Sequence, residues 1–176
     1  MHDDSFAAVV RFHGHLCPGL AIGYRMTRAA LAALGAGRAE DEDLVAVVEN
    51  DACGVDAVQY LSGCTFGKGN LIFRDVGKHA YTFFHRASGR AVRVCAREPV
   101  GAPEDRQARI QWLLSAPEEQ VVAVARLQAD PPPHARVRAS VTCACCGERV
   151  METRARIRDG KPCCIPCAAA RDGAAA

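Results

Sequence analysis

Hydrophobic residues in the first 130 positions repeat at helical spacing in some segments and at strand spacing in others. Residues 5–12, 18–34 and 54–61 carry apolar side chains three or four positions apart, which predicts three helices. Pro18 suits the first position of the second helix, so Cys17 is its predicted N-cap.

The segment between these helices and the segment after them carry the predicted strands. Leu44–Val48 is a short β-rich run, and the pattern becomes strand-like again from Asn70 to Arg97. Two further helices are predicted over 103–114 and 117–127, since each opens with proline at a helix N-terminal position. This order of elements predicts an α+β fold.

Three consecutive prolines, Pro131–Pro133, mark the clearest boundary in the chain, because such a run holds an extended and stiff connection. The predicted organisation is an α+β core domain over residues 1–129, a proline-rich linker over 130–139 and a small module over 140–176. The module is predicted to be treble-clef-like or zinc-ribbon-like.

Composition places the chain among ordinary globular proteins, with 49% hydrophobic and 24% charged residues. No apolar run is long enough for a membrane span, and the acidic start lacks the features of a signal peptide. We therefore expect a cytoplasmic protein. In a reducing cytosol, ten cysteines indicate metal ligands or catalytic groups more than disulfides.

Four of the six tail cysteines have the spacing of a structural zinc site. Cys143 and Cys146 form one C-x2-C pair, and Cys164 and Cys167 form a second pair seventeen residues later. Two such turns direct four sulfurs at one centre, which is the tetrahedral arrangement that zinc prefers. Cys145 and Cys163 do not fit this spacing and are predicted to be spectators.

A second candidate site lies near the N-terminus. His13, His15 and Cys17 alternate along an extended stretch, so their side chains fall on one side of it. Cys17 at a helix N-terminus is placed where the helix dipole favours a thiolate, and Cys53 precedes the next predicted helix. A histidine and cysteine set of this kind suits a catalytic or substrate-binding zinc.

Two questions about this second site stay open at the sequence level. The set of His15, Cys17 and Cys53 offers three ligands, and either His13 or Cys64 can supply a fourth. The alternative interpretation is that these groups are packed histidines and buried thiols without metal.

A glycine-flanked lysine occurs in residues 65–70, the sequence Thr-Phe-Gly-Lys-Gly-Asn. It lacks the spacing of a nucleotide phosphate loop. The loop either presents Lys68 to an anionic group or is a flexible connection into the next strand.

Several separated motifs together resemble the FmdE-like family, whose namesake is the FmdE component of formylmethanofuran dehydrogenase, a molybdenum or tungsten enzyme. The motifs are Phe-His-Gly-His-Leu-Cys-Pro-Gly at 12–19, Glu-Asn-Asp-Ala-Cys-Gly-Val-Asp-Ala at 49–57, Gly-Cys-Thr-Phe-Gly-Lys-Gly-Asn at 63–70 and Asp-Val-Gly-Lys at 75–78. The tail is similar to the zinc module of many family members. The resemblance implies an α+β core, often dimeric, with a metal-binding histidine and cysteine cleft.

The first functional hypothesis is a metal-binding accessory subunit or small metal-dependent enzyme linked to one-carbon or molybdopterin-enzyme metabolism. Zinc would occupy the four-cysteine site, and a second zinc or other transition metal would bind His15, Cys17 and Cys53. Candidate catalytic residues are His15, Cys17 and Lys68, with Lys68 or Asp51 facing a substrate. We expect a homodimer, with subunits of a molybdopterin or tungstopterin enzyme as candidate partners.

The alternative hypothesis is a zinc-finger regulator that acts on RNA polymerase or another macromolecule. The tail resembles the zinc fingers of such regulators, but the chain has no sustained heptad run for a coiled-coil arm. Net charge is +2, and the tail lacks a basic stripe with interleaved aromatic residues. The sequence therefore does not favour nucleic-acid binding.

Overall fold

The computed structural model describes residues 5–173, and the chain divides into two compact units, residues 1–135 and 136–176. We call them the core unit and the tail unit. The division lies inside the predicted linker, 130–139. No helix within the described residues is both long enough and apolar enough to cross a membrane.

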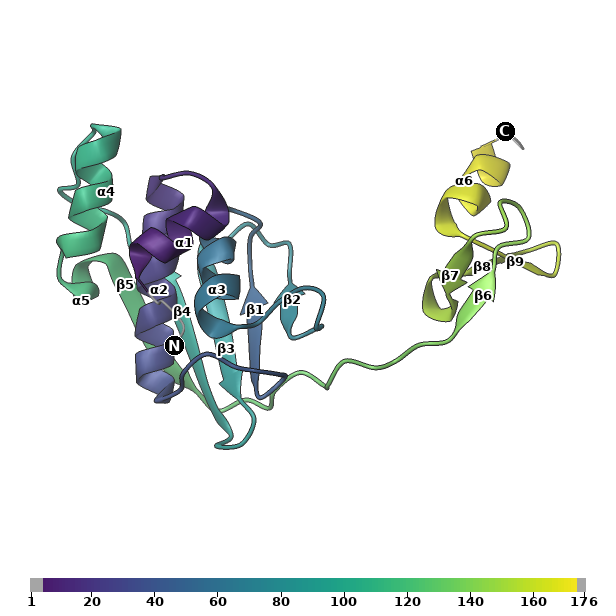
Figure 1. The fold of residues 1–176 in the computed structure, drawn as a ribbon, viewed down its shortest axis with the longest axis horizontal. Coiled ribbons are helices and arrows are strands. Elements are labelled where there is room, and N and C mark those ends of the chain that lie inside the picture. The colour runs from purple at the N-terminus through teal and green to yellow at the C-terminus, as the bar shows by residue number, and fades with distance from the viewer. Residues whose placement is uncertain (1–4, 174–176) are drawn as a thin grey trace. The chain divides into compact units, whose positions relative to one another are not determined.

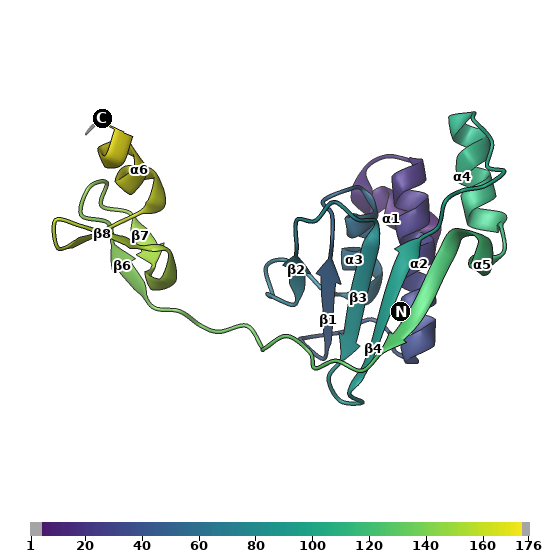
Figure 2. The same ribbon diagram turned by 180° about the vertical axis from the view of Figure 1, so that it is seen from behind.

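The core unit is one sheet with helices on a single face (Figures 1 and 2). Its helices are α1 (Phe6–His13), α2 (Pro18–Leu34), α3 (Gly54–Ser62), α4 (Arg106–Ser115) and α5 (Glu118–Val121). Its strands are β1 (Leu44–Val48), β2 (Leu71–Phe73), β3 (Ala80–His85), β4 (Arg90–Ala96) and β5 (Val122–Leu127). The strand order is β2-β1-β3-β4-β5, in which only the β1–β2 pair is parallel.

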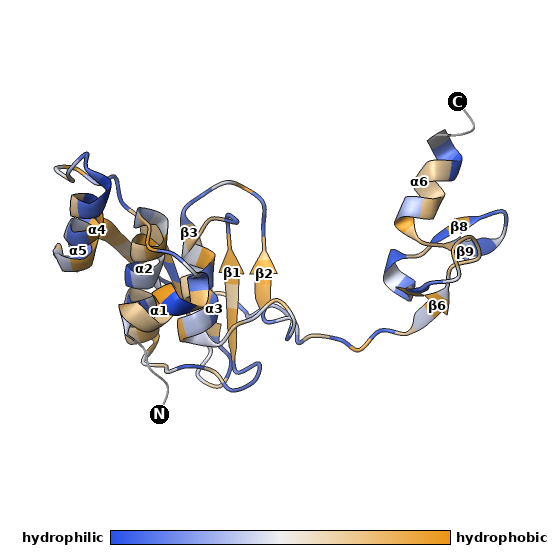
Figure 3. Ribbon diagram, turned by 45° about the horizontal axis from the view of Figure 1, so that its top comes forward, coloured by the Kyte–Doolittle hydropathy of each residue, from blue (hydrophilic) through white to orange (hydrophobic). Residues whose placement is uncertain are grey.

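Helix α2 lies against the sheet and forms most of the helical side of the hydrophobic core. Leu20, Met26 and Leu34 are completely buried on it, and Tyr81 and Phe83 are completely buried on β3. Strand β1 is buried along its whole length, and β1 and β2 appear as strongly hydrophobic ribbons in Figure 3. The core unit thus has a packed interior that needs no metal to account for it.

Most predicted elements of the core unit are confirmed, but the helix predicted over 117–127 is wrong. Only a single turn, α5, is helical there, and residues 122–127 form strand β5. Val122 pairs with Ala96 and Leu127 pairs with Ala91, so β5 extends the sheet at the edge of β4. Valine favours the pleated surface of a sheet, and this tertiary pairing outweighs the helix signal of Pro117.

The tail unit consists of two short hairpins, a 3-10 turn and a helix. Its elements are β6 (Ser140–Thr142), β7 (Arg149–Met151), η1 (Glu152–Arg154), β8 (Arg156–Arg158), β9 (Lys161–Cys163) and α6 (Ile165–Gly173). The pairs β6–β7 and β8–β9 are antiparallel. Apart from Cys143, Cys163 and Ala168, the described residues of this unit include no fully buried hydrophobic side chain.

Candidate metal centre

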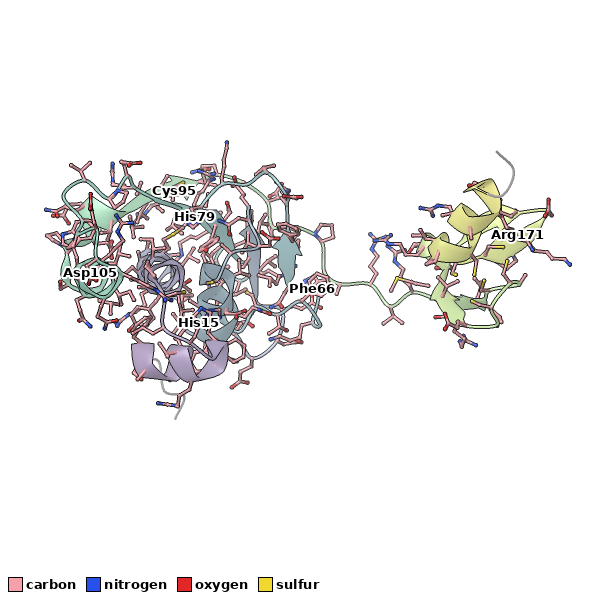
Figure 4. The ribbon with its side chains drawn as sticks, turned by 90° about the horizontal axis from the view of Figure 1, so that it is seen from above. His15, Phe66, His79, Cys95, Asp105 and Arg171 are labelled. Carbon is pink, nitrogen blue, oxygen red and sulfur yellow. The ribbon has the colours of Figure 1, made fainter. Side chains whose placement is uncertain are left out.

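Four side chains meet where the chain passes from α1 to α2 and where α3 begins. One potential ligand atom from each of His13, His15, Cys17 and Cys53 lies within 4.8 Å of the others. Figure 4 shows His15 among helices α1, α2 and α3. Two nitrogen and two sulfur donors at these separations match the donor set and size of a tetrahedral zinc site.

The turn between α1 and α2 positions three of these residues. His13 is the last residue of α1, and Gly14 follows in the left-handed conformation with φ 94°. Cys17 is the N-cap of α2, as the sequence predicts, and its Sγ accepts a hydrogen bond from the backbone N–H of Leu20 at 3.3 Å. A sulfur that accepts a backbone N–H is held in the orientation a ligand needs.

Two glycines bring the fourth residue, Cys53, to this turn. A Cβ on Gly23 of α2 would lie 2.3 Å from Cα of Gly54, the first residue of α3, so the backbones of the two helices touch there. A Cβ on Gly19 would likewise lie 3.5 Å from Cβ of Cys53. The close approach at Gly23 is open only to glycine, and it sets the two cysteines at adjacent helix starts.

His13 carries the clearest sign that the cluster is built for a cation. Its Nδ1 lies 2.6 Å from Oδ2 of Asp56, whereas its Nε2 is buried and has no hydrogen-bond partner. Because a carboxylate only accepts, Nδ1 carries the hydrogen, and in its neutral form the ring presents a lone pair at Nε2. An unpartnered buried nitrogen is costly unless something binds it, and a carboxylate behind a histidine is the usual support of a metal ligand.

The proximity of the two thiols in the cluster affects the pKa of Cys53. Burial and the adjacent Cys17 thiol raise the pKa of Cys53. The Cys53 thiol therefore resists ionisation unless a cation binds it, so metal binding at Cys53 would release a proton.

A cavity of about 400 Å³ opens beside the cluster, with His13 and Cys53 in its wall. Asn50 and Asp51 contribute polar groups, and Phe66 and Phe73 supply exposed aromatic faces. The cavity is large enough for a small molecule next to the donor atoms.

The structure separates the other sequence candidates from this cluster. Lys68 directs its ammonium to the carbonyl oxygens of Glu40 and Asp41 and does not line the cavity. Cys64 is completely buried in the hydrophobic core, where burial raises its pKa to about 11. Of the two alternatives for the fourth group, the structure places His13 with the other three.

Sequence reasoning did not single out Asp56 or the Gly23–Gly54 contact. Asp56 follows Cys53 by three residues, so both face the same side of α3. That spacing is a local signal that could have identified the supporting carboxylate. The glycine contact joins segments about thirty residues apart and has no local signal.

The tail unit holds a second cluster, Cys143, Cys146, Cys164 and Cys167, whose sulfurs also lie within 4.8 Å of one another. The backbone N–H groups of Cys146, Cys164 and Cys145 surround Cys143 and lower its pKa to about 5. The distances from Cys145 N and Cys164 N to this sulfur are 3.4 and 3.3 Å. Amides that stabilise a thiolate in this way are typical of a zinc knuckle.

Comparisons with known proteins cover both units, and one of them bears on the four-cysteine cluster. Residues 138–173 match the prokaryotic dksA/traR C4-type zinc finger. The solved structure of a tungsten formylmethanofuran dehydrogenase FmdE-like protein from Syntrophus aciditrophicus superposes with a TM-score of 0.67 and 25% identity, over 93% of this chain and 90% of that one.

A curated relative from Archaeoglobus fulgidus is named "Probable S-adenosyl-L-methionine-binding protein". It is 32% identical over 189 aligned positions, which cover 89% of this chain but only 50% of the relative. The chain therefore spans about half the length of that protein. Residues 12–130 match the family model described as FmdE, molybdenum formylmethanofuran dehydrogenase operon. The chain belongs to the FmdE family and carries a C4-type zinc finger at its C-terminal end.

Proposed function

We propose that the core unit binds a transition metal, zinc by its donor set, through His13, His15, Cys17 and Cys53, and that a small ligand occupies the adjacent cavity. The observation that carries the proposal is the geometry of His13, whose Nε2 is buried and unpartnered while Asp56 fixes its Nδ1. When bound, the metal would supply a Lewis acid or lower the pKa of a bound water.

The four candidate ligands are not held equally. Asp56 supports His13 and the Leu20 amide supports Cys17. The described residues offer no hydrogen bond to the ring of His15, which lies beside the His13 ring with centroids 4.2 Å apart and the two rings tilted by 43°. His15 is also exposed, whereas Cys17 is buried. We therefore assign His15 as the replaceable ligand. A metal site with one replaceable ligand can accept a substrate in its place.

The residues that line the cavity indicate which kind of small molecule it can bind. Asp51 and Asp56 are acidic, and the described residues that line the cavity include no lysine or arginine. Phe66 and Phe73 offer flat apolar surfaces at its wall. This arrangement suits a neutral or cationic ligand with an apolar or aromatic portion.

The physiological setting that we propose is one-carbon or molybdopterin-enzyme metabolism, either as an accessory subunit or as a small metal-dependent enzyme. Family membership and the name of the Syntrophus protein support this setting. The name of the Archaeoglobus relative adds S-adenosyl-L-methionine, a cation with an aromatic base, as a ligand to test against the cavity.

Metal counting tests the proposal directly. Zinc-reconstituted protein should contain two metals per chain, and His15→Ala should bind the core metal more weakly and regain affinity when imidazole is added. His79→Ala is the matched control, because His79 is exposed and lies outside both clusters. A single zinc per chain in the unaltered protein would refute the core site.

The regulator hypothesis is a second candidate because the tail matches a dksA/traR finger. Regulators of that kind act through a long helical arm. The longest helix in the part of the chain that the structure describes is α2, and it is packed into the core unit instead of projecting from it. A pull-down in which RNA polymerase binds the protein, and not a Cys146→Ser variant, would favour this second candidate.

We also propose a homodimer. Strands β2 and β5 are the edges of the core sheet, and sheet edges in small domains are commonly covered by a partner. Light scattering at micromolar concentration should give the mass of two chains, and the mass of one chain would contradict the proposal.

A further inference from the structure

Two cysteines of the tail unit remain outside the four-cysteine cluster and lie against each other. The Sγ atoms of Cys145 and Cys163 are 3.2 Å apart, although eighteen positions separate the two residues. Neither belongs to the group of four sulfurs that can share a metal. The sequence predicts them to be spectators, so their contact is a feature that only the fold reveals.

The fold holds this pair together through the knuckles themselves. Cys145 lies inside the first C-x2-C turn, and Cys163 ends β9 directly before the second turn. The backbone N–H of Ala144 donates to the carbonyl of Pro162 at 2.8 Å, so a main-chain hydrogen bond ties the two segments one residue away from the sulfurs. The same contacts that assemble the zinc cluster therefore keep the second pair in reach of a bond.

The two thiols differ sharply in access. Cys145 is exposed, whereas Cys163 is completely buried. A reagent in solution can reach the first sulfur but not the second. This combination of an accessible thiol with a sheltered neighbour suits a two-step exchange, in which one cysteine attacks and the other resolves.

We propose that Cys145 and Cys163 form a dithiol site that closes reversibly into a disulfide by exchange with a small-molecule disulfide such as oxidised glutathione. The Cys145 thiolate attacks one glutathione sulfur, which forms a mixed disulfide and releases one glutathione thiolate. The Cys163 thiolate then attacks the Cys145 sulfur, which forms the intramolecular bond and releases the second glutathione. Two protein thiols are oxidised by two electrons, glutathione disulfide is reduced to two thiols, and the two protons of the protein thiols pass through solvent to the released glutathione.

Closing this bond would tie the two zinc knuckles together without using a zinc ligand. The bond encloses residues 146–162, which hold strands β7 and β8 and the turn η1 between them, and thus much of the tail unit. The zinc cluster keeps its four sulfurs in both states. We therefore expect the oxidised tail unit to release its metal to a chelator more slowly than the reduced unit.

The test uses full-length, zinc-loaded protein incubated with excess oxidised glutathione and then quenched with acid. Thiols counted after denaturation should fall from ten to eight, with zinc content unchanged, and peptide mapping should find Cys145 joined to Cys163. Ten remaining thiols would overturn the proposal. Crosslinks among Cys143, Cys146, Cys164 or Cys167 with loss of zinc would overturn it as well, because oxidation would then act on the metal ligands.

Single variants give the order of the two steps. Cys163→Ser should stop with one glutathione attached to Cys145, and Cys145→Ser should remain unmodified because the buried thiol is out of reach. Cys95→Ser is the matched control and should still close the bond, since Cys95 is a half-buried thiol of the core unit. If Cys163 in the Cys145→Ser variant takes up as much glutathione as Cys145 does in Cys163→Ser, the assigned roles are wrong. Whether the Cys145–Cys163 disulfide forms at all is tested by the peptide map of the unaltered protein.

Discussion

The two clusters of this protein have equally close donor atoms but different surroundings. In the tail unit, the buried apolar cluster consists of Cys143, Cys163 and Ala168, so cysteines in and beside the C-x2-C turns form the core. In the core unit, the donor cluster lies where α1, α2 and α3 meet, and Cys17 packs there in a smaller apolar group with Val9 and Leu20. The large hydrophobic interior between α2 and the sheet is a separate group of residues. Metal in the tail would therefore substitute for a missing core, whereas metal in the core unit would be added to a scaffold that is already packed.

The donor atoms of the two clusters also differ in type. The tail offers four sulfurs from two knuckles, which is a closed set typical of structural zinc. The core unit offers two histidines and two cysteines. One of the histidines, His15, is exposed and receives no hydrogen bond from the described residues. We therefore propose that the tail site serves folding and that the core site serves ligand binding.

The largest expected effect comes from breaking the tail cluster. Cys146→Ser or Cys167→Ser should remove one zinc per chain and unfold residues beyond about 140, because structural zinc supplies about 10–16 kcal/mol in zinc-finger peptides. Elemental analysis and limited proteolysis measure the two effects. The core unit should keep its own melting transition, and undiminished zinc in both variants would show that the four-cysteine assignment is wrong.

The opposite result is expected for the core cluster. Cys17→Ser and Cys53→Ser should each lose one metal per chain, while the melting temperature of the core unit changes little, because the hydrophobic interior stays intact. Serine nearly preserves the size of cysteine, so little cavity is formed. Full metal retention together with a lowered melting temperature would indicate packed thiols and no metal site.

How far the sequence predicts these two regions depends on whether the signal is local. The tail ligands follow from the spacing of Cys143, Cys146, Cys164 and Cys167 alone, because each knuckle is a local turn. The helix starts at Pro18 and Gly54 are equally local, and both are confirmed.

What the sequence could not predict depends on contacts between distant segments. The contact of Gly23 with Gly54 brings Cys53 to the turn that holds His13, whereas Cys64 lies elsewhere in the core. Neither glycine segment carries a sequence pattern that predicts this contact. The sequence predicts a helix where β5 lies for the same reason, since only pairing with β4 makes that segment a strand.

A third effect contrasts Cys64, which lies outside both clusters, with Cys143 of the tail cluster. Burial raises the pKa of Cys64 to about 11 from the ordinary 9.0, whereas backbone amides lower the pKa of Cys143. Between pH 9.0 and about 11 the folded chain holds the Cys64 proton and the unfolded chain releases it, so the unfolded state binds fewer protons. The contribution of Cys64 to stability is therefore complete below pH 9.0 and is lost as the pH rises to about 11.

A pKa difference of about 2 corresponds to ~3 kcal/mol in the free energy of unfolding. Urea unfolding of the core unit should be measured at about pH 8 and about pH 10.5, on either side of the ordinary thiol pKa. The free energy of unfolding should fall more between these two pH values for the unaltered protein than for Cys64→Ala. Cys64→Ala should also keep both metals. Equal pH dependence in the two proteins would mean that this thiol is less buried in solution, and loss of the core metal would make Cys64 a ligand after all.

The smallest effect concerns the group behind the core ligands. Asp56 lies 2.6 Å from Nδ1 of His13, and its other oxygen accepts a hydrogen bond from Nε2 of Gln59 at 3.1 Å, so the carboxylate is itself held in place. Asp56→Asn keeps the shape but removes the charge that orients the ring and makes Nε2 of His13 a better metal ligand. Supporting carboxylates of this kind are worth about 10–100-fold in metal affinity. Competition with a chromogenic chelator should therefore show weaker binding by the core site only, and the tail site should be unchanged.

Gln59→Ala provides the graded control for this last prediction, because it loosens Asp56 without removing its charge. We expect its affinity for the core metal to lie between those of the unaltered protein and Asp56→Asn. Cobalt substitution adds a second measurement, because the ligand-field bands of cobalt in the core site report the donor set directly. These bands would not change if Asp56 had a purely structural role. If Asp56→Asn binds metal as tightly as the unaltered protein and gives the same bands, the Asp56–His13 contact is a surface ion pair, and the buried Nε2 of His13 must be satisfied in another way.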